Sequence, residues 1–191
     1  MSKKKKFFGL IIIILLLATI FSTALPIFYS NDKAGKVNKE IQNLHFDFLK
    51  NETKKYVLLF FGYVGCSNIC PPALNEISQI YNKLDKEQFS FYFINLQLNI
   101  LKDNVDPFAK VFNEDFKGIY LDDKKLFDIT TKLQVKYSPV NKIDIDHTGF
   151  LYLLEKSTDN MYKQKFIYTA RPFDIEYISN DLNSIKRGNN D

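Results

Sequence analysis

The two cysteines of the chain, Cys66 and Cys70, lie in the short segment FFGYVGCSNICPP, residues 60–72. Three residues separate them, and residues at positions i and i+4 of a helical turn lie on one face, about 5–6 Å apart. Two thiols in this arrangement can form a disulfide with each other or bind one metal ion together. A disulfide that closes so short a loop removes little entropy from the unfolded chain, so a purely structural role is disfavoured.

The inventory of soft ligands favours one kind of metal. Thiolates bind Cu(I), zinc and iron–sulfur clusters. Structural zinc normally takes four Cys or His ligands and an iron–sulfur cluster takes four thiolates, but this chain has two cysteines and two histidines, His45 and His147. A three-coordinate Cu(I) site needs one histidine, so the inventory favours copper, and zinc remains an alternative if His45 joins. The redox motif of thioredoxin is Cys-x-x-Cys, one residue shorter than here, and thiol–disulfide exchange also remains open.

The net charge of the chain gives no reason to expect nucleic-acid binding. The formal charge is +4, and the lysines at 3–6 account for it, since the remainder carries 22 Lys and Arg against 22 Asp and Glu. The body of the protein is therefore close to neutral, without the excess of positive charge that nucleic-acid binding requires.

The N-terminal sequence predicts a membrane anchor. Four lysines precede an apolar run over residues 7–28, long enough for a helix to cross a bilayer. The lysines should stay in the cytoplasm and place the rest across the membrane; a cleaved signal peptide is the alternative. We therefore expect a basic stub and transmembrane anchor at 1–29, a polar tether at 30–42 and one folded domain at 43–187.

Hydrophobic periodicity predicts the elements of this domain. Strands are expected at 44–49, 56–63, 89–96, 118–121, 149–155 and 163–169, and helices from Pro71 onward, at 105–116, at 122–135 and at 172–185. Parallel units come first and a hairpin last, which is the order of a three-layer, thioredoxin-like α/β fold with a central mixed sheet and helices on both faces. Loops at the carboxyl ends of central strands carry the chemistry of such sheets, and both cysteines lie on one.

Two segments of the chain resemble the signatures of the Sco/SenC family. The segment FFGYVGCSNICPPALNEI, residues 60–77, is similar to the pattern Phe-Gly-Tyr-x-x-Cys-x-x-x-Cys-Pro followed by a small residue, Leu and an acidic helix. The segment IDIDHTGFLYLLE, residues 143–155, is similar to the second pattern, Val-Asp-His-Ser/Thr before a hydrophobic strand. The two lie in the order that the family has, and the resemblance extends over about residues 44–186.

The resemblance implies a metallochaperone rather than an enzyme. It implies that Cys66, Cys70 and His147 bind one copper ion, as Cu(I), and that Asp146 orients the imidazole. Family members help to assemble the binuclear copper centre of cytochrome c oxidase, by delivering copper, by reducing the cysteines of the acceptor, or both. A thiol–disulfide oxidoreductase, or a redox or copper sensor that uses the cysteine pair without metal, is the alternative.

The expected location and partners follow from the same resemblance and from the N-terminus. We expect a single-pass protein of the inner membrane whose C-terminal domain lies in the periplasm. Its partner would be the copper-accepting subunit of a terminal oxidase or another periplasmic thiol protein. The family usually has an Asp-Pro-x-Arg-Asp-Thr stretch after the second buried strand, where this chain has INLQLNILKDN, residues 94–104, and its first hairpin is shortened to LHFDFLKNETKK, residues 44–55. The first difference leaves the identity of the partner open.

Overall fold

The computed structural model describes residues 12–19, 34–141, 144–158 and 160–187. The chain divides into two units, residues 1–33 and 34–191. In the first unit residues 12–19 are helical, and the rest of the predicted membrane anchor lies outside the described residues. Among the residues described, no helix combines the length and the hydropathy needed to cross a membrane.

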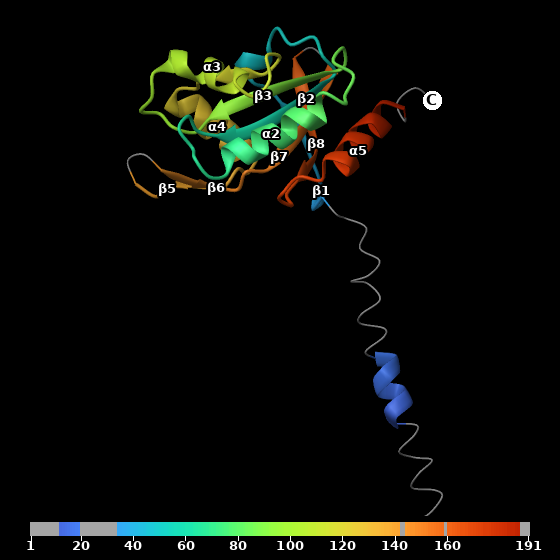
Figure 1. Ribbon diagram of the computed structural model, residues 1–191. Helices are drawn as coiled ribbons and strands as arrows, with labels where there is room; N and C mark the ends of the chain where they lie inside the picture. The colour runs from blue at the N-terminus through green and yellow to red at the C-terminus, as the bar shows by residue number, and fades with distance from the viewer. Residues whose placement is uncertain (1–11, 20–33, 142–143, 159, 188–191) are drawn as a thin grey trace, which may run out of the picture. The chain divides into compact units, whose positions relative to one another are not determined.

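The second unit is built on a six-stranded mixed sheet in the order β1–β8–β7–β2–β3–β4 (Figure 1). Strands β2, β3 and β4 are parallel, whereas β7 pairs antiparallel with both β2 and β8, and β8 pairs antiparallel with β1. A separate antiparallel pair is formed by β5 and β6. The strands are β1 (Lys36–Leu44), β2 (Tyr56–Gly62), β3 (Phe89–Asn95), β4 (Lys117–Ile119), β5 (Tyr137–Pro139), β6 (Ile145–His147), β7 (Leu151–Thr158) and β8 (Met161–Tyr168).

Helices cover both faces of this sheet. The helices are α2 (Cys70–Tyr81), α3 (Val105–Lys110), α4 (Asp123–Lys132) and α5 (Ile175–Arg187), with short 3₁₀ turns η1 (Asp47–Leu49) and η2 (Lys102–Asn104). One core cluster packs α2, α3 and α5 against one face, and a second packs α4 and η1 against the other. Every residue of β2 and β3 is buried because alternate side chains enter the two clusters. The predicted three-layer arrangement is therefore confirmed.

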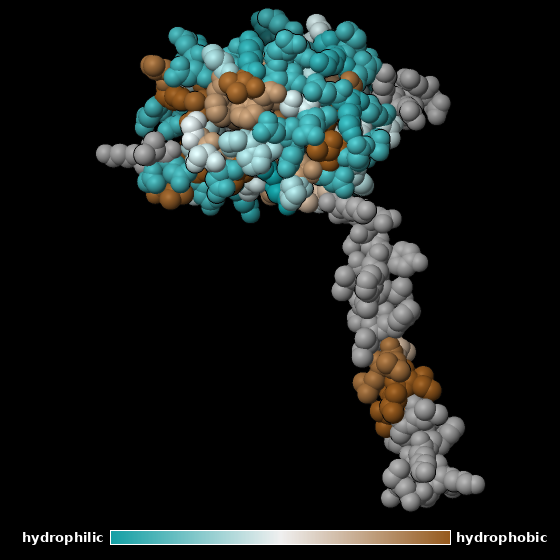
Figure 2. Space-filling view, in the orientation of Figure 1, coloured by the Kyte–Doolittle hydropathy of each residue, from teal (hydrophilic) through white to brown (hydrophobic). Residues whose placement is uncertain are grey.

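The surface of the second unit differs in polarity from its two buried clusters. The face seen in Figure 2 is mainly hydrophilic, with separate hydrophobic patches. Asp122 is the N-cap of α4, because its side chain accepts a hydrogen bond from the Lys125 N–H at 2.9 Å. Such a cap satisfies one of the free N–H groups of the first helical turn.

Three expectations about secondary structure need correction. Residues 44–49 are not a strand, because the chain turns through η1 there, and the edge strand lies earlier, at Lys36–Leu44. Most of the expected polar tether is therefore β1, whose polar sequence reflects an edge strand that is largely exposed to solvent. The helix expected at 105–116 ends at Lys110, where Asn113 hydrogen bonds to Ser78 and so holds the following turn against α2.

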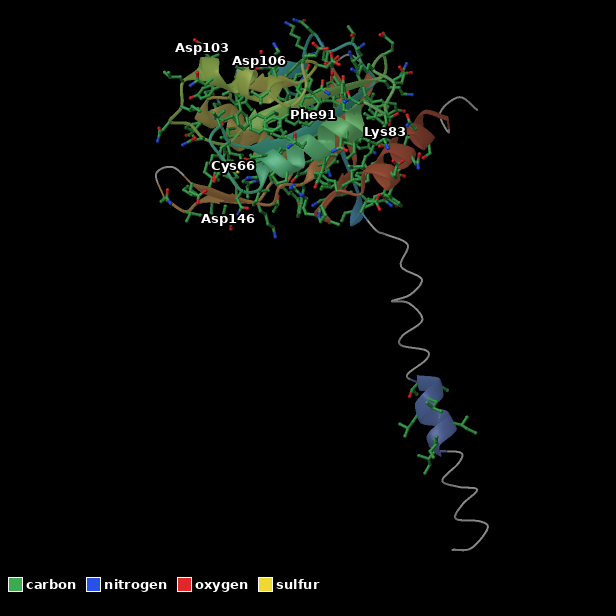
Figure 3. All side chains as sticks on the ribbon, in the orientation of Figure 1. Cys66, Lys83, Phe91, Asp103, Asp106 and Asp146 are labelled. Carbon is green, nitrogen blue, oxygen red and sulfur yellow. The ribbon has the colours of Figure 1, made fainter. Side chains whose placement is uncertain are left out.

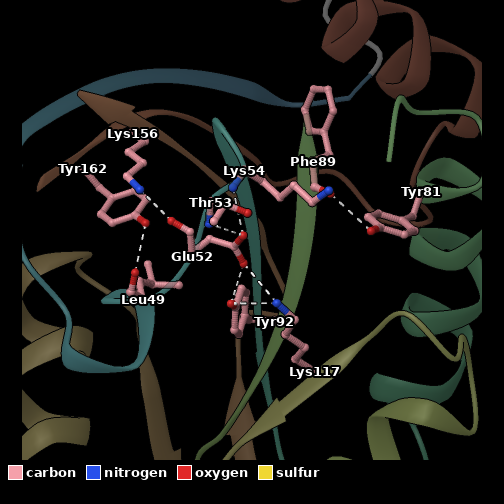
Figure 4. Close-up of polar contacts among 10 residues, drawn as sticks. All are labelled: Leu49, Glu52, Thr53, Lys54, Tyr81, Phe89, Tyr92, Lys117, Lys156 and Tyr162. Atoms are coloured by element: carbon pink, nitrogen blue, oxygen red, sulfur yellow. Dashed lines mark hydrogen bonds and ion pairs between the residues drawn. The ribbon is translucent and has the colours of Figure 1, made fainter. Parts of the chain in front are cut away.

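One buried carboxylate joins the strands at the end of the sheet opposite to the cysteine loop. Glu52 accepts hydrogen bonds from the Tyr92 hydroxyl at 2.5 Å, from Lys117 Nζ at 3.1 Å and from the N–H groups of Thr53 and Lys54 at 2.9 Å (Figure 4). Burial alone would raise the pKa of Glu52, but the hydrogen bonds from Tyr92, Lys54 and Lys117 outweigh it and lower this pKa to about 2. The network therefore depends on an ionised carboxylate.

Replacing this carboxylate should change how stability depends on pH. A pKa lowered in the folded state stabilises the protein above the ordinary value of 4.5, and this contribution is lost as the pH falls from there towards about 2. We expect Glu52→Gln to lower the free energy of unfolding at neutral pH by about 2–4 kcal/mol and to flatten its decline over that acid window. Denaturant unfolding at a series of pH values measures both.

Glu87→Gln is the matched control for this experiment, because the side chain of Glu87 is exposed and pairs only loosely with Lys54, at 3.4 Å. Its effect should stay within about 0.5 kcal/mol. A pH profile of Glu52→Gln that is as steep as that of the unmodified protein would contradict the proposed role of the carboxylate.

Candidate metal centre

The two cysteines lie on the loop that connects β2 to α2. Strand β2 ends at Gly62, and Cys70 is the first residue of α2. Between them the chain turns at Gly65, which adopts φ +90, a conformation that favours glycine. The Cys66 N–H donates to the Tyr63 carbonyl at 3.2 Å, and the Cys70 N–H lies 3.4 Å from Cys66 Sγ. The turn therefore brings both sulfurs to the beginning of the helix.

Two residues that the sequence reasoning did not identify shape this loop. A Cβ atom on Gly62 would lie 2.7 Å from Cys70 Sγ and 2.9 Å from the ring of Phe93, so only glycine leaves room for the sulfur. The side-chain oxygen of Asn95, at the end of β3, accepts a hydrogen bond from the Val64 N–H at 3.2 Å. A glycine inside a fully buried strand was the signal for such a close approach.

His147 lies beside the cysteines in the fold, although it comes much later in the sequence. It is the last residue of β6 and pairs with Tyr137 of β5. Its side chain is buried, with edge-to-face contacts to the rings of Phe60 and Tyr63. His147 Nε2 lies 3.6 Å from Cys70 Sγ, and Nδ1 has no hydrogen-bond partner among the described residues.

The three predicted ligands therefore converge. The sulfurs of Cys66 and Cys70 and a ring nitrogen of His147 all lie within 4.8 Å of one another, and all three residues are buried. Both cysteines are free thiols. With metal–ligand bonds of roughly 2.0–2.3 Å, the donors around a three-coordinate ion lie about 4 Å apart, so small shifts would suffice. The donor set, two sulfurs and one imidazole nitrogen, suits a soft ion.

Two other candidates do not join this group. Asp146 lies on β6 (Figure 3) and is exposed. Because successive residues of a strand face opposite ways, its side chain lies on the other side of the strand from that of His147. No hydrogen bond links it to His147 in the described part of the chain, so the expected orienting role is wrong. His45 is half exposed and contacts Asp47 and the backbone of Asn160 instead. The zinc alternative, which needed His45, therefore loses its fourth ligand.

The two thiols differ in acidity because they interact closely. A hydrogen bond from the Cys70 thiol lowers the pKa of Cys66 against the effect of burial, with further contributions from His147 and from the backbone N–H groups of Cys70 and Asn68. The same hydrogen bond and burial raise the pKa of Cys70. The first proton therefore leaves Cys66, and the apo site holds a thiolate beside a thiol.

A side-chain hydrogen bond joins the cysteine loop to the segment that carries His147. The Tyr63 hydroxyl donates to the Asp144 carboxylate, at the entrance to β6. Burial, this hydrogen bond and the negative charge of Cys66 all raise the pKa of Tyr63, so the phenol stays protonated and remains a donor. Tyr63 belongs to the first sequence signature, but only the fold reveals its partner.

Comparison with known proteins agrees with this geometry. The chain is 25% identical over 134 residues to an SCO2-like protein of Rickettsia conorii, which covers 65% of this chain and 64% of that protein. It is similar in fold to Arabidopsis thaliana ScoI, solved with copper bound, with a TM-score of 0.63, 19% identity and coverage of 80% of this chain and 99% of that one. BsSco, described as a member of the Sco family of cytochrome c oxidase assembly proteins with a disulfide switch, gives a TM-score of 0.54 at 14% identity, covering 78% and 94%.

These solved structures share the thioredoxin-like arrangement of sheet and helices, and at such low identity they support the fold alone. The family assignment rests on the sequence itself. The model of the SCO1/SenC family matches residues 50–182, a range that contains both cysteines, His147 and nearly the whole sheet. The protein belongs to the SCO1/SenC family.

Proposed function

We propose that this protein is a copper metallochaperone that binds one Cu(I) ion through Cys66, Cys70 and His147. We further propose that it helps to assemble the binuclear copper centre of a respiratory cytochrome c oxidase. The observation that carries the proposal is the convergence of these three buried donors within 4.8 Å of one another. Two proteins of similar fold support it, one solved with copper bound and one described as a cytochrome c oxidase assembly protein.

The chemistry of the donors explains the preference for Cu(I) as the cargo. Two thiolates and one imidazole are soft or borderline ligands, and three of them satisfy Cu(I), whereas structural zinc takes four. Copper binding requires the loss of the proton from Cys70 as well as from Cys66, so binding releases protons and tightens as the pH rises. Because Cys66 keeps a small exposed fraction of 6% and Cys70 has none, Cys66 is the ligand that an acceptor thiolate would replace first.

The same thiols support a second candidate function, reduction of a disulfide in the acceptor. The lowered pKa of Cys66 favours it. The Cys66 thiolate would attack one acceptor sulfur to form a mixed disulfide and release the other acceptor sulfur as a thiolate. Cys70, after losing its proton, would then attack Cys66, which closes the Cys66–Cys70 disulfide and releases the second acceptor thiol. Two electrons pass to the acceptor, and His147 is not consumed.

We propose the location and partner from the sequence. The lysines at 3–6 before the apolar run at 7–28 favour a single-pass inner-membrane protein with its C-terminal domain in the periplasm. The partner would then be the copper-accepting subunit of a terminal oxidase or another periplasmic thiol protein. The segment 94–104, which differs from the family pattern, begins in the buried end of β3, but residues 97–104, which include η2, are exposed or partly exposed, and a partner-specific contact could form there.

Copper titration of the reduced protein tests the metal site. We expect binding close to one ion per chain, with His147→Ala weakening Cu(I) affinity by more than about tenfold, because even residues that only support metal ligands are worth roughly 10–100-fold. Competition with a chromophoric Cu(I) chelator measures the affinity. His45→Ala is the matched control, since that histidine is exposed and lies outside the group. Full affinity in His147→Ala would rule out the proposed ligand set.

Alkylation as a function of pH tests the asymmetry of the thiols. Since the pKa of Cys66 is lowered, its thiolate persists below neutral pH. Labelling of Cys66 by iodoacetamide should therefore change little between about pH 8 and pH 6, whereas an ordinary thiol loses most of its thiolate there. Mass spectrometry assigns the labelled residue.

The control for this labelling is Cys70→Ala, which removes the hydrogen bond that lowers the pKa of Cys66. In this variant the labelling rate of Cys66 should regain a steep dependence on pH. The account of the thiol pair is wrong if the unmodified protein already shows that steep dependence, or if Cys70 reacts first.

A further inference from the structure

A single arginine connects the two loops that carry the proposed ligands. Arg171 lies between β8 and α5, and its half-buried side chain donates from Nη1 to the Gly149 carbonyl at 2.7 Å and from Nη2 to the Ile69 carbonyl at 3.2 Å. Ile69 directly precedes Cys70, and Gly149 follows His147 by two residues. The guanidinium therefore fixes the cysteine loop and the histidine loop to the same rigid group.

The backbone at Gly149 leaves room for the Arg171 side chain. Gly149 adopts φ +60, and a Cβ atom there would lie 2.8 Å from the side chain of Ile69 and 3.0 Å from Arg171 Nη1. The Ile69 carbonyl also accepts the first hydrogen bond of α2, from the Ala73 N–H at 3.3 Å. Arg171 thus holds the first turn of the helix on which Cys70 lies.

The guanidinium lies in a partly desolvated environment against the backbone of the two loops, and it interacts electrostatically with both thiols. Its Cζ lies 4.6 Å from the centre of the Phe173 ring, and Nε has no hydrogen-bond partner among the described residues. Burial lowers the pKa of Arg171, while the negative charges of Glu76, Cys70 and Cys66 act in the opposite direction. Arginine stays charged under such conditions, and away from bulk water its charge acts more strongly on its neighbours.

The charge balance of the site indicates what this cation does. Two thiolates, a neutral imidazole and one Cu(I) ion carry a net charge of −1, and the thiolate form of the empty site is also negative, whereas the Cys66–Cys70 disulfide is neutral. A fixed positive charge nearby therefore stabilises the reduced and the copper-bound forms relative to the disulfide.

We propose that Arg171 is a positioning residue of the Cys66–Cys70–His147 site. Its two hydrogen bonds set the approach of the ligand loops, and its charge favours the reduced dithiol and the bound cation over the disulfide. The part of this proposal that concerns copper rests on the proposed function. The part that concerns the dithiol holds without any metal.

The reduction potential of the metal-free protein tests the role of the charge. In thiol–disulfide equilibrium with glutathione, Arg171→Gln should shift the equilibrium constant towards the disulfide by about tenfold, which corresponds to a potential about 30 mV more negative. Arg171→Lys keeps the charge and loses the paired hydrogen bonds, so it should retain more than half of the effect on the potential. Cu(I) affinity, measured by chelator competition, should fall about tenfold in Arg171→Gln because the hydrogen bonds that position the two ligand loops are lost.

Lys83→Gln is the matched control, because it removes one positive charge from an exposed position near the far end of α2 (Figure 3). There Lys83 pairs with Glu176. Its potential and Cu(I) affinity should equal those of the unmodified protein. Thermal unfolding of each variant separates these effects from loss of the fold. If Arg171→Gln does not fold, Arg171→Lys replaces it. The Cu(I) affinity of Arg171→Lys should then be weaker than that of the unmodified protein, because lysine cannot make both hydrogen bonds of the arginine.

The outcomes distinguish this proposal from the proposed function. If folded Arg171→Gln has the same potential and Cu(I) affinity as Lys83→Gln, the positioning role is wrong while the three ligands stand. The same conclusion follows if Arg171→Lys is tested in its place and, when folded, binds Cu(I) as tightly as the unmodified protein. If His147→Ala binds copper normally, the ligand set fails, but a lowered potential in Arg171→Gln still supports the action of Arg171 on the dithiol.

Discussion

The antiparallel pairing of β2 with β7 is the constraint on which the site depends. In that pairing Phe60 lies opposite Leu151, so the residues that follow β2 lie beside the residues that precede β7. The first group is the cysteine loop and the second contains His147. Residues 77 positions apart in sequence meet here because one strand ends where its neighbour begins. The parallel partner β3 supports the same end of the sheet through Asn95, which hydrogen bonds to the loop.

Burial gives this junction its chemical character. Two thiols and an imidazole are buried together, so they interact with one another rather than with water. These interactions lower the pKa of Cys66, which therefore loses its proton first. Around the group, the Tyr63 hydroxyl donates to Asp144 and the Arg171 guanidinium donates to the carbonyls of Gly149 and Ile69, so both hold the loops that carry the three residues. In the role that we propose for Arg171, its charge favours a negatively charged state of the pair, which a metal-bound or reduced dithiol provides and a disulfide does not.

Much of the fold and part of the candidate site could be predicted from the sequence, because these features depend on local patterns. The buried strands appear as apolar runs, Asp122 is a recognisable N-cap, and the spacing of Cys66 and Cys70 indicates a metal or redox site. His147 is identified by the second signature, in which a histidine precedes a hydrophobic strand. These are the features in which periodicity and spacing carry the information.

The remaining features depend on tertiary contacts that no local pattern records. Strand β1 looks like a polar linker because an edge strand leaves much of its surface in water. The direction of Asp146 follows from the three-residue strand β6, which is too short to predict from hydrophobicity. Arg171 lies more than 100 residues from Ile69 in the chain, and its hydrogen bonds to Ile69 and Gly149 follow only from the tertiary fold.

The most direct test of the central claim is X-ray absorption spectroscopy at the copper edge, on the reduced and copper-loaded protein. The account predicts a Cu(I) ion with two sulfur ligands and one nitrogen ligand, and the loss of the nitrogen in His147→Ala. A copper ion bound by sulfur alone in the unmodified protein, or a nitrogen ligand that persists in His147→Ala, would contradict it.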